Sequence, residues 1–296
     1  MDYFGRKLNE YKANLHTHST SSDGRFPPQE VVRLYAQGGY DVLAFTDHKR
    51  ANRISELDSM GMTLISGMEL HPTGPRGIRW HLLGLGVPED FAYPEPQTGQ
   101  EAVDAVNAAG GIVFCAHPYW CGFTSAEVGA LKGILGIEVY NTLTRYIGKE
   151  YNMQIWDELL DAGHRYTALA VDDMHWEHDL FKGFTVILAE DKSPAALLDA
   201  LKKGQFYASQ GPRFSRITLE DNVLIADFTP VGSAIAIRRQ SGGYAAAIED
   251  ALGPGSENPE ISHLEYDLSP FSGNYVRIQL RDRAGHLAWS NPVFVP

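Results

Sequence analysis

The feature that most constrains this chain is a repeated pattern, in which a short apolar run is followed by a residue that can bind a metal ion. The apolar runs are expected to be strands, and they cover residues 13–18, 41–46, 61–67, 78–86, 112–116, 136–141 and 166–171. Stretches with helical patterning lie between several of them, at 27–36, 99–109 and 149–161. Strands that alternate with helices predict a parallel α/β architecture. Because ligand-type residues gather near the carboxyl ends of seven strands, we expect a barrel with its functional site at that end.

Nine side chains at or near these strand ends are of types that coordinate metal ions. They are six histidines and three carboxylates: His16, His18, Asp23, His48, Glu69, His81, His117, Asp173 and His175. Side chains two residues apart leave the same face of a strand, so His16 and His18 would converge on one point. A lone histidine in an α/β core is more often structural, but nine such residues at successive strand ends are hard to explain by a core alone.

The composition of this ligand set indicates the class of metal. With imidazoles and carboxylates and no thiolate, the set suits Zn(II), Mn(II) or Fe(II), and the sequence does not rank these. Nine ligands are too many for one metal ion that keeps a coordination position open for water or substrate. We therefore expect two or three clustered divalent ions.

Composition excludes several classes of protein. The chain has 296 residues and a formal charge of −12, so nothing broadly basic is available to bind a nucleic-acid scaffold. No apolar run approaches the ~20 residues of a membrane span, and the first 15 residues lack a signal-peptide core. Two cysteines, Cys115 and Cys121, give no disulfide framework. These features predict a cytoplasmic protein without membrane partners, and they do not indicate an oligomeric state.

The sequence changes character beyond residue 205. Short runs with period-two alternation, such as 217–220, 223–228, 234–237 and 275–280, are separated by glycine, proline and asparagine. This pattern predicts a small antiparallel β-sandwich. We expect two domains, a barrel over residues 1–210 and a sandwich over residues 211–296.

Four short motifs resemble those of the PHP family, named for polymerase and histidinol phosphatase. They stand here as His16-Thr-His18, Thr46-Asp-His48, Ala116-His-Pro118 and Asp173-Met-His175, and Glu69 and His81 also match. The resemblance covers about residues 11–212. It is closest to the carbaryl-hydrolase-like branch of metallohydrolases, on the segments 172–175, 207–212 and 288–292.

The resemblance implies a distorted (β/α)7 barrel that holds a cluster of three ions. By analogy, His16, His18, Glu69 and Asp173 would hold the first ion. Glu69 would also bridge to a second ion, which His81 and His117 complete. The third ion would be held by Asp23, His48 and His175, although many family members have a histidine where this chain has Asp23.

These features predict a metal-dependent hydrolase, and first a phosphoesterase that acts on a small phosphate monoester or diester. A hydroxide bridging two ions would attack in line, and Arg145 is the candidate phosphate clamp. We expect Glu138 and Asp172 to orient ligand imidazoles. One alternative is hydrolysis of a carbamate or carboxylic ester on the same cluster. The other is a non-catalytic binding module whose sandwich recognises a glycan or a partner.

Overall fold

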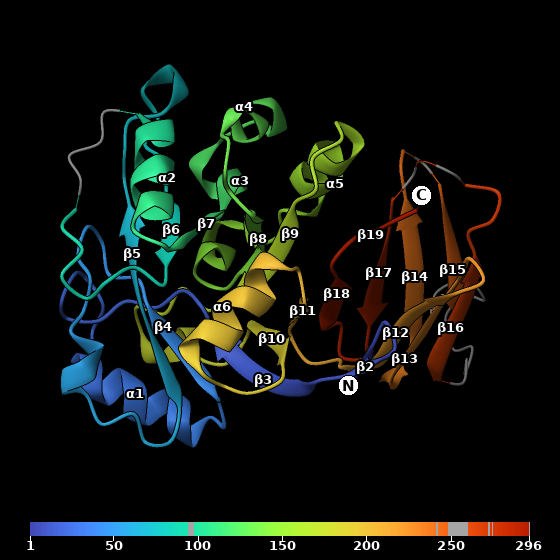
Figure 1. Ribbon diagram of the computed structural model, residues 1–296, viewed down its shortest axis with the longest axis horizontal. Helices are drawn as coiled ribbons and strands as arrows, with labels where there is room; N and C mark the ends of the chain where they lie inside the picture. Colours follow the sequence, from blue (N-terminus) through green and yellow to red (C-terminus); the bar gives the residue numbers. More distant parts are fainter. Residues whose placement is uncertain (94–97, 241, 248–259, 272, 274, 296) are drawn as a thin grey trace.

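A computed structural model describes residues 1–93, 98–240, 242–247, 260–271, 273 and 275–295. In Figure 1 the helices gather around the strands on the left, and the C-terminal strands form the right-hand part. No helix among the described residues is long and apolar enough to cross a membrane.

All seven strands expected in the first 171 residues are present, but the first ends at Asn14 and the fourth begins at Leu82, so His16, His18 and His81 lie outside the strands expected to contain them. The seven strands are β3 (Asn9–Asn14), β4 (Val42–Phe45), β5 (Thr63–Leu70), β6 (Leu82–Leu85), β7 (Ile112–Cys115), β8 (Gly136–Asn141) and β9 (Thr167–Val171). They pair in chain order within one sheet, and an eighth strand, β10 (Phe184–Ala189), precedes β3 in that order. The sequence reasoning missed β10, an apolar run that is buried throughout.

The expectation of a wholly parallel sheet is wrong at two places. β6 runs antiparallel to both β5 and β7, and β10 runs antiparallel to β3, whereas the other neighbouring pairs are parallel. The link between β5 and β6, residues 71–81, holds only a 3-10 turn. A parallel return needs a longer crossover, usually a helix, so this short link brings the chain back antiparallel.

The strands at the two ends of this run, β9 and β10, are joined through the side chain of Thr185. Thr185 of β10 donates from Oγ1 to the Ala170 carbonyl of β9 (3.0 Å) and accepts from the Ala170 N–H (3.3 Å). Among the described residues no backbone ladder joins β9 to β10. The structure is therefore a mixed α/β fold with large sheets, and the closed (β/α)7 barrel stays a prediction.

Six α-helices are described. They are α1 (Pro28–Gln37), α2 (Gly99–Ala108), α3 (Pro118–Cys121), α4 (Ser125–Ala130), α5 (Met153–Asp161) and α6 (Pro194–Lys202). Four 3-10 turns accompany them: η1 (Ile54–Glu56), η2 (Pro75–Gly77), η3 (Leu143–Ile147) and η4 (Glu177–Asp179). Thr98 and Glu101 form a reciprocal capping box at the start of α2, which satisfies two N–H groups of the helix terminus.

The remaining strands lie at the two ends of the chain. They are β1 (Asp2–Tyr3), β2 (Arg6–Lys7), β11 (Phe206–Ser209), β12 (Phe214–Glu220), β13 (Val223–Val231), β14 (Ser233–Arg238), β15 (Gly243–Ala247), β16 (Ile261–Asp267), β17 (Tyr275–Arg281), β18 (Leu287–Ser290) and β19 (Val293–Phe294). One sheet has the order β16-β13-β12-β1-β2, and the order β15-β14-β17-β18-β11 continues into β10. Buried side chains of both sheets, such as Leu264 and Ile278, belong to one core.

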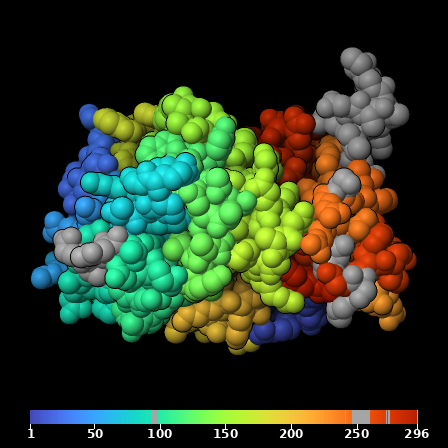
Figure 2. Space-filling view, turned by 90° about the horizontal axis from the view of Figure 1, so that it is seen from above, coloured from blue at the N-terminus to red at the C-terminus, as the bar shows by residue number. Residues whose placement is uncertain are grey.

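The C-terminal strands are joined firmly to the rest of the fold. β18 pairs with β11, and Trp289 of β18 is fully buried beside Tyr140 of β8. Arg277 of β17 donates two hydrogen bonds of 2.7 Å to Asp157 of α5. Figure 2 shows the red C-terminal segment lying against the yellow-green residues around α5.

Candidate metal centre

The nine predicted ligands lie around one cavity of about 180 Å³. Seven of them line it, and His16 and His18 lie beside these, fully buried. The cavity wall consists of Asp23, His48, Glu69, His81, His117, Trp120, Leu143, Thr144, Asp173 and His175. Asp23 and His48 follow β3 and β4, Glu69 lies near the end of β5, His81 directly precedes β6, and His117 and Asp173 follow β7 and β9.

Four of these side chains converge on one point. The Nε2 atoms of His16 and His18 lie 3.1 and 3.2 Å from Asp173 Oδ1, and 3.5 and 3.3 Å from Glu69 Oε2. Both of these oxygens are buried and lack a donor in good hydrogen-bond geometry in the described structure, although His48 Nδ1 also lies 2.8 Å from Glu69 Oε2. Buried acceptors without a partner cost about 1–3 kcal/mol each, so a cation between the four groups fits their arrangement.

Glu69 faces two groups of histidines at once. Its Oε1 lies 2.7 Å from His81 Nδ1 and 3.5 Å from His117 Nε2, on the side opposite the first group. Burial alone would raise the pKa of Glu69, but the imidazoles around it, His16 and His117 among them, hold it well below its usual range. Glu69 is thus an ionised carboxylate placed between two sets of imidazoles.

A third group gathers around Asp23 at the cavity mouth. The carboxylate lies 3.3 Å from His48 Nε2 and 3.2 Å from His175 Nε2, and its side chain is 56% exposed. Burial alone would lower the pKa of both histidines, but hydrogen bonds to Asp23 raise it to about 10 for His48 and about 9 for His175. The groups expected for the three ions are therefore each brought together, and the exposed one is held less tightly.

Backbone conformation also marks the site. His117 and Asp173 have φ angles of +26° and +51°, in a region that non-glycine residues rarely adopt. Such strain is stored where the surrounding structure fixes it, and it gathers at functional sites. It lets each side chain point into the cavity directly after its strand ends.

Two buried carboxylates organise the loops that carry the ligands. Glu138 accepts from His16 Nδ1 (2.6 Å) and from the His117 N–H (2.9 Å), so its expected orienting role agrees with its contacts. Asp47 accepts from the Ser19 N–H (2.8 Å) and from the hydroxyl of Ser22 (2.6 Å), which fixes the loop before Asp23. The sequence reasoning did not assign Asp47 any role, although it stands next to His48.

The expected role of Asp172 is wrong. This carboxylate contacts no ligand imidazole in the described structure, and it accepts from the backbone N–H groups of Phe181, Lys182 and Gly183 at 2.8–3.0 Å. Burial raises its pKa to about 6. Asp172 therefore shapes the turn after η4. The expectation failed because a D-D-x-H motif does not show which of its two carboxylates points into the cavity.

Arg145, the candidate phosphate clamp, is directed elsewhere. Its guanidinium donates to Asp179 Oδ1 (3.1 Å), to the Tyr146 hydroxyl (2.7 Å) and to two backbone carbonyls, and it does not line the cavity. Asp179 in turn accepts from the N–H groups of His175 and Trp176. The contacts support an indirect role in holding His175, and the clamp role stays a prediction.

Three residues beside the cavity had no role assigned from the sequence, although His71 was expected to lie near the site. Trp120 lines the wall with its side chain 43% exposed, and its ring lies 5.1 Å from that of His117. His71 Nε2 lies 2.7 Å from His48 Nδ1, and Cys121 Sγ lies 3.5 Å from His117 Nδ1. Each stands two to four residues after a predicted ligand, which is the only signal in the sequence that points to it.

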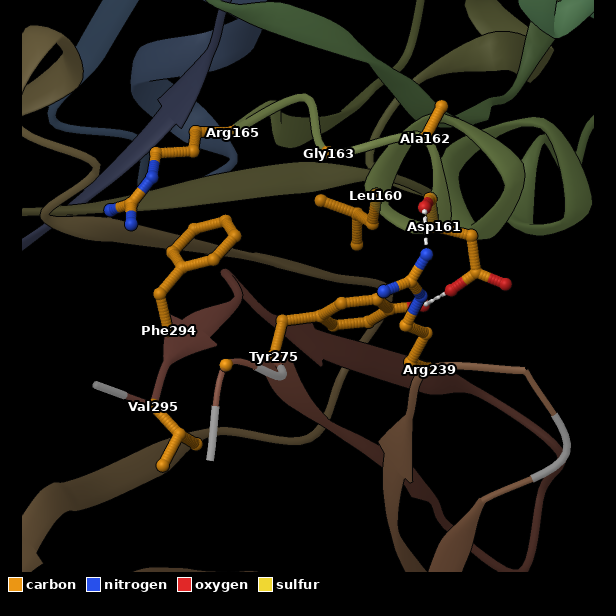
Figure 3. Close-up of a pocket in the computed structure, with 10 residues that line it drawn as sticks. Leu160, Asp161, Ala162, Gly163, Arg165, Arg239, Tyr275, Phe294 and Val295 are labelled. Atoms are coloured by element: carbon orange, nitrogen blue, oxygen red, sulfur yellow. Dashed lines mark hydrogen bonds between the residues drawn. The ribbon is translucent and has the colours of Figure 1, made fainter. Parts of the chain in front are cut away.

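A second cavity, of about 280 Å³, lies between the end of α5 and the C-terminal strands (Figure 3). Tyr275 donates to Asp161 there, and Arg165 stacks on Phe294 with its guanidinium carbon 4.2 Å from the ring centre. It contains none of the predicted metal ligands. The chemistry expected from the sequence therefore belongs to the first cavity.

Comparisons with known proteins extend these observations. No protein-family model matches the chain. It is 43% identical over 89 residues to a 5'-3' exoribonuclease of Haemophilus influenzae, covering 28% of this chain and 31% of that protein. It is 38% identical over 81 residues to a phosphoribosyl 1,2-cyclic phosphate 1,2-diphosphodiesterase of Eggerthella lenta, covering 26% and 31%. The chain thus spans about a third of the length of the curated relatives it matches.

One solved structure resembles the whole chain. It is a two-domain protein from Bacteroides vulgatus that contains a predicted PHP-like metal-dependent phosphoesterase. The TM-score is 0.55, the sequence identity is 15%, and the match covers 97% of both chains. At this identity the likeness shows the fold alone, and the chain shares the fold of that PHP-like two-domain protein.

Proposed function

We propose that this chain is a metal-dependent phosphoesterase that cleaves a small phosphate monoester or diester. The observation that carries the proposal is the pair of buried oxygens, Glu69 Oε2 and Asp173 Oδ1, which face the Nε2 atoms of His16 and His18 at 3.1–3.5 Å. Groups buried in such an arrangement need a proton or a cation between them, and a divalent ion would satisfy all four at once. The partial matches to an exoribonuclease and a phosphodiesterase support phosphate esters as substrates.

We further propose two or three divalent ions, of zinc, manganese or iron, in the three groups described above. His16, His18, Glu69 and Asp173 would hold the first ion, and Glu69, His81 and His117 the second. Asp23, His48 and His175 would hold a third. Ions bound there would supply an activated water and would neutralise charge on a phosphoryl group.

The protein's own residues prepare this site in three ways. Glu138 accepts the Nδ1–H of His16, so Nε2, which faces Asp173, is the nitrogen that would bind an ion in place of its proton. Burial lowers the pKa of His81 to about 4, so this imidazole is neutral at pH 7 and available as a ligand. Trp120 and Leu143 line the cavity and limit the access of bulk water to it.

Single-stranded nucleic acid is a second candidate substrate, contrary to the expectation drawn from net charge. Trp120 and Trp176 are 43% and 44% exposed near the cavity, and the guanidinium of Arg25 lies 5.3 Å from the Trp176 ring centre. Exposed aromatic rings and arginine provide stacking surfaces for bases. The match to an exoribonuclease favours the same class.

The carbaryl-hydrolase-like alternative remains a proposal for the same cavity. A hydroxide held between metal ions can attack a carbamate or carboxylic ester as well as a phosphate. None of the matched relatives described above carries that activity in its name.

A substrate panel tests the order of these candidates. Metal-loaded protein would be assayed on phosphate monoesters, on bis(p-nitrophenyl) phosphate, on cyclic nucleotides, on a 5'-labelled single-stranded oligonucleotide and on aryl carbamates. Chelated protein serves as the control in each case. We expect hydrolysis of a phosphate ester that chelation abolishes, and activity on carbamates alone would refute the phosphoesterase.

We also propose that residues 1–210 and 211–296 form two structural parts, except that β1 and β2 join the sheet of the second part, and that the second part supports the first. Among the described residues, no predicted metal ligand lies beyond His175. The pairing of β11 with β18 and the contact between Arg277 and Asp157 support this proposal. Truncation after residue 212 should reduce solubility or stability, and a folded truncated protein that has lost metal would contradict it.

A further inference from the structure

Two ligand imidazoles of this site are held through the nitrogen that faces away from the metal groups. His16 Nδ1 is held by Glu138 at 2.6 Å, and His175 Nδ1 by the backbone carbonyl of Asp173 at 2.9 Å. A partner of this kind fixes the tautomer and the ring rotation of a metal-binding histidine. The corresponding partner of His117 is of a different chemical type.

His117 is held by a thiol. Its Nδ1 lies 3.5 Å from the sulfur of Cys121, which follows one turn later in α3 and is half-buried. The Cys121 N–H also donates to the His117 carbonyl at 3.2 Å, so the turn itself brings the sulfur to the ring. The contact is therefore built into the local fold.

The two nitrogens of His117 face different surroundings. Nε2 lies 3.5 Å from Glu69 Oε1 and 3.8 Å from Asp173 Oδ2, whereas Nδ1 faces the thiol. The donor atoms of His81, His117 and Cys121 lie within 4.8 Å of one another, which by itself would also suit a metal ion. However, the lone pairs of the two ring nitrogens diverge, so an ion bound to Nε2 beside Glu69 lies away from the sulfur.

We propose that Cys121 is a positioning residue for His117. Its sulfur accepts the Nδ1–H of His117 and holds the imidazole so that Nε2 faces Glu69 and Asp173. The restraint is needed because the backbone of His117 has a φ of +26° and the strand ends immediately before it. This inference rests on the metal centre proposed above, and it concerns only how one ligand is held.

Removal of the thiol should weaken metal binding without changing the number of ligands. Metal-free wild type and Cys121→Ala would be titrated with Zn²⁺ against a chromophoric chelator. We expect one binding step of Cys121→Ala to be weakened about 10–100-fold, the usual effect of losing such a partner. Cys121→Ser, which keeps an acceptor, should recover part of the affinity.

Cys115→Ala is the matched control. Cys115 is the other cysteine of the chain, and it is fully buried in the core with its sulfur near the Ala116 carbonyl. Its removal should lower the melting temperature and leave zinc affinity unchanged. Equal affinity of wild type and Cys121→Ala would overturn the proposal.

Cobalt substitution separates positioning from direct ligation. A thiolate bound to Co²⁺ gives an intense charge-transfer band in the near ultraviolet, and we expect none in wild type or in Cys121→Ala. A band in wild type that Cys121→Ala abolishes would make Cys121 a ligand and refute the positioning role. A wild-type protein that binds neither metal would refute the metal centre itself, which distinguishes the two failures.

Discussion

Replacement of Glu69 by glutamine should be the most damaging conservative change in the candidate metal centre. Glu69 is 1% exposed, and its two oxygens face different histidine groups at 2.7–3.5 Å. Asp23→Asn is the matched comparison, because it also replaces a carboxylate by an amide of the same shape. Asp23 is more than half exposed, and apart from His48 and His175 at the cavity mouth only His18 Nδ1, at 3.7 Å, lies close to it among the predicted ligands.

The size of the difference follows from the surroundings of each carboxylate. Unit charges about 3.5 Å apart attract by about 5 kcal/mol at an effective dielectric constant of about 20, and by about 1 kcal/mol in water. The first value applies to the buried Glu69, and the second to the exposed Asp23. Since about 1.4 kcal/mol is a tenfold change, Glu69→Gln should weaken metal binding by roughly a thousandfold or more, and Asp23→Asn by roughly tenfold.

The assay is metal content and turnover of the two variants, prepared identically and checked for folding by circular dichroism. Glu69→Gln should lose two ions and all activity, because it leaves both neighbouring groups without their shared carboxylate. Asp23→Asn should lose one ion at most and keep part of its activity. If Asp23→Asn loses two ions while Glu69→Gln loses none, the assignment of Glu69 as the bridge is wrong.

Three further perturbations test separate parts of the structure. Glu138→Gln should lower zinc affinity about 10–100-fold, because the amide would place an NH2 group against donors that now share a buried carboxylate. Unchanged zinc affinity in a chelator titration would contradict this. Arg277→Met should lower the free energy of unfolding in urea by roughly 2–3 kcal/mol, since it leaves Asp157, which is one-third exposed, without its partner. The double variant Arg277→Met/Asp157→Leu should recover part of that loss, and a single variant as stable as wild type would argue against the ion pair. Although burial opposes it, hydrogen bonds to carboxylates raise the pKa of His48 to about 10 and that of His175 to about 9, above the unfolded value of about 6.5. Their contribution to the stability of the metal-free protein is therefore fully present below pH 6.5 and lost as the pH rises through 9 to 10. The melting temperature of metal-free protein should fall over that range, and zinc binding at pH 7 should release protons in calorimetry; a flat profile without proton release would refute both assignments.

The strand ends were predictable because each carries two signals at once. An apolar run such as 112–116 predicts a buried strand, and a ligand-type residue directly after it predicts the edge at which the strand ends. This pattern placed the nine candidate ligands around one cavity, where the structure also has them. That they bind metal stays a prediction.

The direction of strands and the contacts around the ligands were harder to predict. β6 is antiparallel because the link before it is short and contains no crossover helix, and periodicity alone gives no direction. β10 was missed although its run, Phe184–Ala189, is as apolar as the others. Two carboxylates, Glu190 and Asp191, follow it, but β10 runs antiparallel to β3, so its carboxyl end lies at the opposite edge of the sheet from the cavity.

The roles of Cys121 and Asp172 depend on geometry that spacing does not contain. Cys121 reaches His117 because α3 begins directly after that histidine. Asp172 and Asp173 are adjacent, and the φ of +51° at Asp173 decides that only the second points into the cavity. A backbone angle of this kind is set by the packed structure around it and leaves no mark in the sequence.

Stepwise metal reloading tests the central claim most directly. Metal-free protein would be titrated with Zn²⁺, Mn²⁺ or Fe²⁺ while bound ions and hydrolysis of bis(p-nitrophenyl) phosphate are measured together. We expect two or three ions to bind per chain, and turnover to appear only when Glu69 has an ion on each side, so the first ion alone gives none. Fewer than one ion per chain after reloading, or full turnover by the chelated protein, would contradict this expectation.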